Sequence, residues 1–286
     1  MKLFSKAAVY LRMIKFSHTI FALPFALSAV VLVHAAKPLD LRTVFWIIVA
    51  MAAARSAAMG FNRVADAFLD AENPRTAIRE IPRGTLSRRE AAFFTLVSSL
   101  VFVIASGALS LLCLGLSFPV LAFLFAYSYT KRFTWLAHIF LGFAIGVSPM
   151  AVWVAATGEM PGAISVLSLA LMTYIAGFDI LYACQDVAFD REKGLHSIPV
   201  YFGVKKAMTI STLLHAISVL ALAWLYLLFP LHGFYLAMVA VIGILFIVEH
   251  RLVHPDDLSR IDIAFFHVNS VISVLVLAAV FFGTIL

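Results

Sequence analysis

Two pairs of aspartates are the residues of this chain whose type and spacing point most directly to chemistry. Asp66 and Asp70 are four positions apart, and so are Asp186 and Asp190. Residues at this spacing share one face of an α-helix, with Cβ atoms roughly 5–6 Å apart. Four converging carboxylates repel one another unless cations join them, and Mg²⁺ usually takes one or two carboxylates together with substrate phosphates and water. The two pairs therefore predict a magnesium site.

Each aspartate pair is preceded by polar residues at helical spacing. Asn62 lies four residues before Asp66, with Arg55 seven residues further back, and Asp179 lies seven residues before Asp186. Arg55 and Asp179 fall inside or near the end of apolar segments, where an ionisable side chain is costly and usually faces a partner or a wet cavity. Because the two pairs are 120 residues apart, we also expect two related halves, a weak internal repeat of the sort seen in many membrane folds.

Many basic residues lie on the same predicted side of the membrane as the two aspartate pairs. Arginine and lysine beside magnesium-binding aspartates are typical of sites that hold a diphosphate. Since this site would open at the end of apolar helices, we expect a substrate with a polyphosphate head and a long lipid tail. Taken singly, an aspartate pair is more typical of a solvated helix face and Lys131-Arg132 of a membrane anchor. The basic residues considered are Arg63, Arg75, Arg79, Arg83, Lys131, Arg132, Arg191 and Lys193.

The composition places these residues in a membrane protein. Of the 286 residues, 63% are hydrophobic and 13% are charged, and the mean hydropathy is +1.03. A soluble domain carries roughly 25% charged residues, so this chain has too little polar surface to cover a globule of its size. The net charge of +6 does not indicate nucleic-acid binding, because basic cytoplasmic loops are normal in membrane proteins. The two cysteines, Cys113 and Cys184, lie far apart in apolar contexts and predict no disulfide.

The expected fold is an all-α, polytopic bundle of nine transmembrane helices that forms a single domain over residues 1–286. All but three of the 21 Lys and Arg residues fall on one side of these spans, which predicts a cytoplasmic N-terminus. The N-terminal segment also has features of a signal peptide, but its basic region and apolar run are long, so we expect it to be retained. The predicted spans are 18–35, 41–61, 91–112, 115–130, 135–156, 163–184, 207–228, 231–248 and 263–285.

Three stretches resemble one known family, the UbiA superfamily of membrane aromatic prenyltransferases. Residues 62–70, NRVADAFLD, resemble its N-x-x-x-D-x-x-x-D motif, and residues 186–194 resemble its second motif, D-x-x-x-D-x-x-x-G. Residues 127–134, YSYTKRFT, resemble the Y-x-x-x-K-R-x-T stretch of its 4-hydroxybenzoate polyprenyltransferases. The resemblance covers nearly the whole chain. It is specific because both aspartate motifs are present.

The resemblance implies transfer of a polyprenyl group from its diphosphate to a hydroxylated aromatic acid in ubiquinone biosynthesis, with Mg²⁺ as cofactor. It implies that the metal is held by Asp66, Asp70, Asp186 and Asp190. The substrates are expected to contact Arg55, Asn62, Arg63, Arg75, Lys131 and Arg132. As catalytic residues we expect Asp186, the first choice for removing the proton, together with Asp179 and Arg132. The site is expected at the cytoplasmic face of a bacterial inner membrane, with the lipid bilayer and the two substrates as the partners and neither nucleic acid nor an obligate protein partner.

The acceptor and the class of protein have alternatives. Residues 12–19 lack the proline and glycine usual in hydroxybenzoate enzymes, and with the run 73–77 they look more like a bacterial branch whose members include enzymes that prenylate a dihydroxynaphthoate for menaquinone. A membrane transporter is the non-enzyme alternative, but most of the acids lie at one membrane face. A CDP-alcohol phosphotransferase needs an Asp-Gly pair, which this chain lacks. A sister prenyltransferase acting in haem or chlorophyll synthesis is the remaining alternative.

Overall fold

The structure is a computed structural model that describes residues 2–160 and 162–286, and within them every regular element is a helix. Nine helical segments in these residues are long and apolar enough to cross a membrane, which confirms the nine predicted spans of an all-α membrane protein. Which side of the membrane holds the N-terminus stays a prediction. The segments are Phe16–Ala36, Leu41–Ala65, Arg88–Leu109, Leu111–Arg132, Ala137–Thr157, Ile164–Glu192, Val204–Leu228, Phe234–Leu252 and Ile263–Ile285.

The chain divides into two compact units. Unit 1 contains the described residues up to Thr19 together with Asp40–Tyr129, and unit 2 contains Ile20–Leu39 and Thr130–Leu286. The first aspartate pair belongs to unit 1 and the second to unit 2. Whether residues 1–286 act as one domain stays a prediction.

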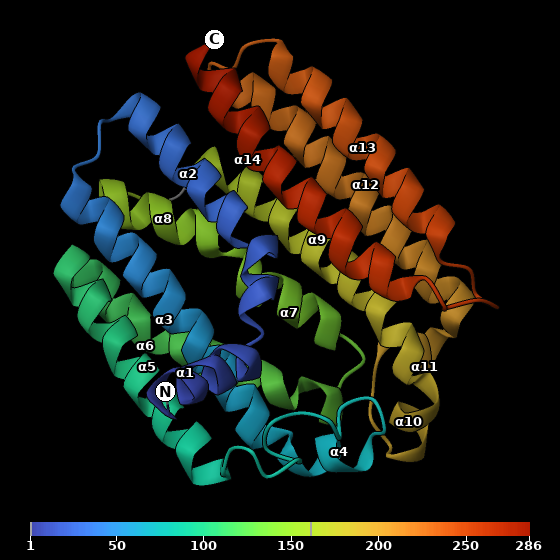
Figure 1. Cartoon of the computed structure of the whole chain (residues 1–286). Coiled ribbons are helices and arrows are strands. Elements are labelled where there is room, and N and C mark those ends of the chain that lie inside the picture. Colours follow the sequence, from blue (N-terminus) through green and yellow to red (C-terminus); the bar gives the residue numbers. More distant parts are fainter. Residues whose placement is uncertain (1, 161) are drawn as a thin grey trace. The chain divides into compact units, whose positions relative to one another are not determined.

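Unit 1 is built around α3, which packs along α5 and also contacts α6 (Figure 1). At the start of each of these helices, a side-chain oxygen accepts a hydrogen bond from a backbone N–H that has no partner within the helix. Asp40 accepts a hydrogen bond from Thr43 N at 2.7 Å, and Ser87 forms a capping box with Glu90. The helices of unit 1 are α1 (Lys2–Met13), α3 (Leu41–Ala65), α4 (Ala67–Glu72), α5 (Arg88–Leu109) and α6 (Leu111–Ala126).

The N-terminal helix α1 is held on unit 1 by a small apolar core. Met13 and Ile14 at its end are buried with Leu86 and Ala91, which belong to the start of α5 and the residues before it. The chain then turns at Lys15, which adopts the left-handed conformation with φ of +50°. Burial of Met13 and Ile14 therefore brings the turn at Lys15 to the end of α3 that carries the first aspartates.

Unit 2 is centred on α9, which contacts α2, α7, α8 and α12 (Figure 1). The span that contains α9 has 78% of its apolar stretch buried, against at most 44% for the other candidate spans in the described residues. The sequence of α9 is therefore apolar on every face of the helix, because protein covers it on every side. The helices of unit 2 are α2 (Leu23–Ala36), α7 (Ala137–Gly146), α8 (Ser148–Thr157), α9 (Ile164–Ala183), α10 (Val187–Glu192), α11 (Ile198–Phe202), α12 (Val204–Leu228), α13 (Phe234–Leu252) and α14 (Asn269–Ile285).

Two spans of unit 2 contain breaks that apolar periodicity does not reveal. The fifth is divided at Val147 into α7 and α8, with Pro149 in the first turn of α8, where a missing N–H costs little. The ninth begins with a π-helix, Ile263–Val268, before continuing as α14. The Asn269 side chain donates to the carbonyls of Ala264 and Phe265 at 3.0 and 3.2 Å, which gives those two carbonyls a donor where the helix changes its winding.

A buried polar network joins α9, α12, α13 and α14. Asn269 Nδ2 donates to Glu249 Oε1 at 2.7 Å, and the Tyr174 hydroxyl donates to the Asn269 carbonyl at 2.8 Å. His215 Nε2 lies 3.3 Å from the Tyr174 carbonyl oxygen, so the network continues into α12. Buried polar groups in an apolar interior cost free energy unless they are paired, so these bonds favour one arrangement of the four helices.

The packing of α12 on α9 depends on a glycine. A Cβ added at Gly177 would lie 2.4 Å from two ring atoms of His215. We expect Gly177→Ala to destabilise the protein by about 1–3 kcal/mol, because the His215 ring must move out of its network. The measurement is the thermal midpoint of unfolding in detergent. Gly243→Ala is the matched control, since its Cβ would meet only Val219 at 3.7 Å. Equal midpoints for both variants would contradict this close packing.

Candidate active site

The first aspartate cluster, defined as Asn62, Asp66, Asp70 and their cationic neighbours in unit 1, lies where α3 gives way to α4. Asp66 is the junction, with φ −96° and ψ 5°, in a backbone region that ordinary helix residues avoid and active-site residues often occupy. The i to i−4 bonds nevertheless continue, from Asp66 N to Asn62 O and from Asp70 N to Asp66 O. The three polar residues therefore keep the register that their spacing predicts, although the expected continuous helix is interrupted.

The two carboxylates of this cluster are held differently. Asn62 Nδ2 donates to Asp66 Oδ2 at 2.8 Å, which orients the Asp66 carboxylate. Asp70 is buried, and its Oδ1 lies 2.6 Å from Arg79 Nη1. Asp70 Oδ2 is also buried and accepts no hydrogen bond from the described residues. One oxygen of Asp70 is thus left for a ligand that the protein itself does not supply.

Arginines of α3 tie the N-terminal segment to the first aspartate cluster. Arg55 Nε donates to Thr19 Oγ1 at 3.0 Å, and its Nη2 donates to the Lys15 carbonyl at 3.2 Å. Arg63 is buried, and its Nε donates to the Met13 carbonyl at 3.0 Å. Both guanidinium groups are therefore fixed by backbone and hydroxyl oxygens of residues 13–19. These oxygens are neutral, so they do not cancel the positive charges of the arginines.

Lys15 adds a further cation that the spacing argument did not identify. Desolvation by the surrounding protein and the nearby positive charge of Arg63 lower the pKa of Lys15, and Arg79 and Arg75 act in the same direction. A lysine whose charge is disfavoured by other cations is a good partner for an anion, because the anion relieves that repulsion. The cluster therefore combines acidic side chains with an excess of positive charge beside them.

The loop after α4 positions Arg75 and Arg79. The Thr76 hydroxyl donates to the Asp70 carbonyl at 3.1 Å, and Asn73 Oδ1 accepts from the Arg75 backbone N–H at 3.0 Å. Asn73 and Thr76 are both buried. These bonds wrap the loop back onto α4, so that Arg79 reaches Asp70.

The second aspartate cluster, defined as Asp179, Asp186, Asp190 and their neighbours in unit 2, repeats the first. Asp186 sits at the start of α10 with φ −95° and ψ 1°, nearly the values at Asp66. Asp186 and Asp190 are buried, and Asp190 Oδ2 lies 3.2 Å from Lys131 Nζ. The pairs Asp66–Asp70 and Asp186–Asp190 thus each have a helix break at the first aspartate, followed by a helix of six residues that carries a buried second aspartate paired with a cation.

Gly194 completes the second motif for a backbone reason. It has φ of +66°, a conformation in which glycine pays no Cβ penalty. The turn lets Leu195 N donate to the Asp190 carbonyl at 2.7 Å. The His196 N–H then donates to the Lys131 carbonyl at 2.7 Å, which brings residues 190–196 against the segment that carries Lys131. Arg132, the next residue, is exposed at the end of the 3₁₀ helix Tyr127–Arg132.

Asp179 has a partner that the sequence did not reveal. His138 Nδ1, on α7, lies 2.6 Å from Asp179 Oδ2. The His138 side chain is fully buried and its Nε2 has no hydrogen-bond partner among the described residues, whereas the Asp179 side chain keeps 24% of its surface exposed. The arrangement is a carboxylate oriented by an imidazole, with the carboxylate on the accessible side.

The structure brings together the predicted residues within each unit. Arg55, Asn62, Arg63, Asp66, Asp70 and Arg75 belong to the first cluster, and Lys131, Asp179, Asp186 and Asp190 belong to the second. Convergence of the two clusters on one substrate stays a prediction. Among the described residues no group of three His, Cys, Asp or Glu side chains is placed to hold a metal ion.

Comparison with known proteins assigns the family. A model of the UbiA prenyltransferase family matches residues 22–271. The chain belongs to this UbiA prenyltransferase family. It is 34% identical over 202 residues to a 4-hydroxybenzoate octaprenyltransferase of Edwardsiella ictaluri, covering 70% of this chain and 69% of that one. It is 27% identical over 271 residues to the enzyme of the same name from Vibrio atlanticus, covering 93% and 94%.

Solved structures of UbiA homologs share the fold. A homolog from Aeropyrum pernix K1 superposes with a TM-score of 0.82 at 30% identity, covering 92% of this chain and 96% of that one. A homolog from Archaeoglobus fulgidus bound to GPP and Mg²⁺ superposes with a TM-score of 0.72 at 21% identity, covering 96% and 98%. This UbiA family member is therefore a multi-pass membrane enzyme of the prenyltransferase class, and the transporter and phosphotransferase alternatives are removed.

Three functional candidates of this UbiA family member were absent from the predicted site residues, for different reasons. Arg79 was one of several loop arginines, and only the turn at Asn73–Thr76 selects it as the partner of Asp70. Lys15 depends on the packing of α1. His138 is separated from Asp179 by 41 residues, and no motif or spacing in the sequence connects α7 with α9.

Proposed function

We propose that the chain transfers a polyprenyl group from polyprenyl diphosphate to a hydroxylated aromatic acid of the 4-hydroxybenzoate type, as a step of ubiquinone biosynthesis. The observation that carries this proposal is the repeated buried aspartate–cation pair after a helix break, Asp70 with Arg79 and Asp190 with Lys131. The relatives named 4-hydroxybenzoate octaprenyltransferase support this acceptor. The basic loops support a site at the cytoplasmic face of a bacterial inner membrane.

Asp66, Asp70, Asp186 and Asp190 would hold Mg²⁺ in this proposal. The fit rests on the donor set, which is all carboxylate, and on the buried Oδ2 of Asp70 that accepts no hydrogen bond from the described residues. When bound, Mg²⁺ neutralises charge on the diphosphate as the allylic C–O bond breaks. The homolog bound to GPP and Mg²⁺ supports this assignment. We propose that both aspartate clusters serve one reaction, since each supplies two carboxylates of the required type.

The cations would bind the diphosphate and the acceptor carboxylate. The N–H donors would come from Lys15, Arg55, Arg63 and Arg75 of the first cluster and from Lys131 of the second. Arg132 is exposed and is proposed to bind the carboxylate of the aromatic acid. Arginine is suited to this role because its planar donor fork matches a carboxylate with two parallel hydrogen bonds.

Replacing Lys15 tests the cationic part of the first cluster. We expect Lys15→Met to weaken binding of magnesium pyrophosphate about tenfold, the loss of one charge-assisted hydrogen bond. Methionine keeps an unbranched side chain at the left-handed φ of residue 15. The measurement is a pyrophosphate titration of the purified protein in detergent, and the matched control is Lys37→Met, at an exposed lysine before α3. Equal affinity for both variants would remove Lys15 from the site.

Asp179 is proposed as the group that accepts the proton released from the aromatic acid. Asp186 was the first choice from the sequence, but a carboxylate that holds a metal is a weaker base. Asp179 is accessible on one side, and His138 orients its carboxylate and can share the proton. The pocket around the prenyl chain must exclude water, since water would otherwise trap the allylic cation.

The test of the proposed function uses membranes that contain the chain, a labelled polyprenyl diphosphate, and either 4-hydroxybenzoate or a dihydroxynaphthoate. We expect magnesium-dependent labelling of 4-hydroxybenzoate that is lost on chelation. Labelling of the dihydroxynaphthoate alone would replace the acceptor and leave the reaction class unchanged. That second candidate is favoured by residues 12–19, which lack the proline and glycine of hydroxybenzoate enzymes. Labelling of neither acid would contradict an aromatic-acid acceptor.

A further inference from the structure

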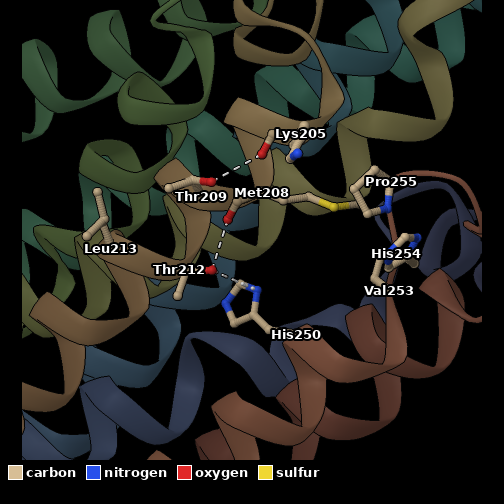
Figure 2. A pocket seen from close by; sticks show the side chains of 9 residues that line it. All are labelled: Lys205, Met208, Thr209, Thr212, Leu213, His250, Val253, His254 and Pro255. Carbon is tan, nitrogen blue, oxygen red and sulfur yellow. Dashed lines mark hydrogen bonds between the residues drawn. The ribbon is translucent and has the colours of Figure 1, made fainter.

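Unit 2 contains a pocket that the prenyl-transfer site does not use. It has a volume of about 430 Å³ and lies between the first turns of α12 and the end of α13 (Figure 2). Its polar lining comes from Lys205, Thr209 and Thr212 on α12 and from His250 and His254 on and after α13. None of these residues belongs to either aspartate cluster. A ligand bound in this pocket would therefore be distinct from the substrates proposed for the aspartate clusters.

The depth of the pocket matches the boundary between headgroups and acyl chains. Lys205 is the second residue of α12 and Leu213 also lines the pocket eight residues later, which is about 12 Å along the helix axis. A headgroup layer is roughly 5–8 Å thick on each side of a hydrocarbon core of about 30 Å. Since the apolar span begins at Val204, we expect the Lys205 end at headgroup level and the Leu213 end among the acyl chains.

The charge of the pocket favours an anion at its outer end. Lys205 supplies an exposed ammonium group, and no carboxylate lines the pocket. His254 Nδ1 lies 3.5 Å from Asp256, so Lys205 is the principal cation. The Thr209 hydroxyl donates to the Lys205 carbonyl, and Thr212 Oγ1 lies 3.0 Å from the Met208 carbonyl oxygen and 3.3 Å from His250 Nδ1, so both hydroxyls already have protein partners. A phosphate group would thus be held mainly by the lysine.

One wall of the pocket is rigid before any ligand arrives. His250 Nδ1 lies 3.3 Å from Thr212 Oγ1, and its Nε2 lies 3.0 Å from Nδ1 of the buried His215. Figure 2 shows the His250 ring beside Thr212, with His254 across the hollow. Because both ring nitrogens of His250 have partners, the wall is preformed, and binding does not incur the cost of ordering it.

We propose that this pocket binds one anionic phospholipid of the surrounding leaflet, with its phosphate on Lys205 and an acyl chain along Met208 and Leu213. The bilayer supplies this ligand at high concentration. A zwitterionic headgroup is expected to fit less well, since none of the described residues that line the pocket offers a carboxylate to its cation, and Asp256 already lies beside His254.

The test measures the thermal midpoint of the full-length protein in detergent during titration with dioctanoyl phosphatidylglycerol. We expect a saturable rise in the wild type and an apparent affinity about tenfold weaker in Lys205→Met. Lys206→Met is the matched control, because Lys206 is an equally exposed neighbour that does not line the pocket. Leu213→Trp, which narrows the acyl end, is expected to weaken binding as Lys205→Met does.

Four outcomes would overturn the proposal. An equal loss in Lys205→Met and Lys206→Met would indicate diffuse surface charge instead of a site. An equal rise with dioctanoyl phosphatidylcholine would remove the preference for an anionic lipid. A full rise with inorganic phosphate at the same concentration would indicate a free anion rather than a lipid. Native mass spectrometry of the same variants provides a second count of bound lipid, and a lipid retained by both Lys205→Met and Leu213→Trp would also contradict the site.

Discussion

Asp66→Ala and Asp186→Ala are each expected to lower prenyl transfer by about a thousandfold or more, while the protein stays folded in detergent. Each variant removes a carboxylate that is proposed to hold Mg²⁺. A bound metal ion stabilises the charge that develops on the diphosphate by several kcal/mol, and this stabilisation would be lost. Both residues sit at helix breaks with nearly identical backbone angles, and the alanine variants remove the carboxylates while we expect the helices to keep their packing. The measurement is product formation at saturating substrate and Mg²⁺.

Asp256→Asn is the control for this pair, since Asp256 is an exposed carboxylate outside both clusters. It should leave activity unchanged. The two variants also test whether the clusters act together, because Asp66 and Asp186 belong to different units. If both clusters serve one reaction, either variant alone removes nearly all activity and the double variant falls little further. Wild-type activity in both single variants would exclude the metal role.

Asp179→Asn is expected to lower kcat by about 10²–10⁴-fold, the usual contribution of a positioned general base. Asparagine keeps the shape of the side chain and its contact with His138 but cannot accept the proton. His138→Gln is expected to give a smaller loss, because it removes the group that orients the carboxylate at 2.6 Å. The measurements are kcat and KM for both substrates, with kcat falling and KM changing little.

The pH profile separates this catalytic role from a structural one. Asp179→Asn should remove the acidic limb of the kcat/KM profile, whereas a variant that only loosens the fold should lower activity evenly across pH. His267→Gln, at an exposed histidine, is the control. An unaltered pH profile in Asp179→Asn would move the proton-accepting role to another carboxylate, with Asp186 as the next candidate.

The buried aspartate–cation pairs also explain how charged residues are tolerated at these helix ends. Asp70 and Asp190 are each buried, and each has one cation within hydrogen-bond distance. Removing one partner of a buried pair leaves an uncompensated charge, which costs more than the pair itself contributes. The pairs therefore place a positive charge beside each buried carboxylate and hold both carboxylates in position.

Much of this protein is determined by the sequence alone, because the relevant signals are local. Apolar stretches of about 20 residues predict spanning helices whatever their neighbours, and all nine predicted spans are present in the described residues. Spacings of four residues place Asn62, Asp66 and Asp70 in one register, and the backbone bonds of the structure keep that register. Gly194 is also a local signal, since the left-handed turn after α10 favours a residue without a Cβ.

Tertiary structure decided the partners of those residues and the places where helices break. Arg79 was one of several arginines until the Thr76–Asp70 bond folded its loop back, and His138 reaches Asp179 only because α7 packs on α9. The break at Val147 and the π-helix at Ile263–Val268 leave the apolar periodicity of their spans almost unchanged. Spacing along the chain reports which residues share a helix face, whereas contacts between helices depend on packing, for which one sequence contains no periodic signal.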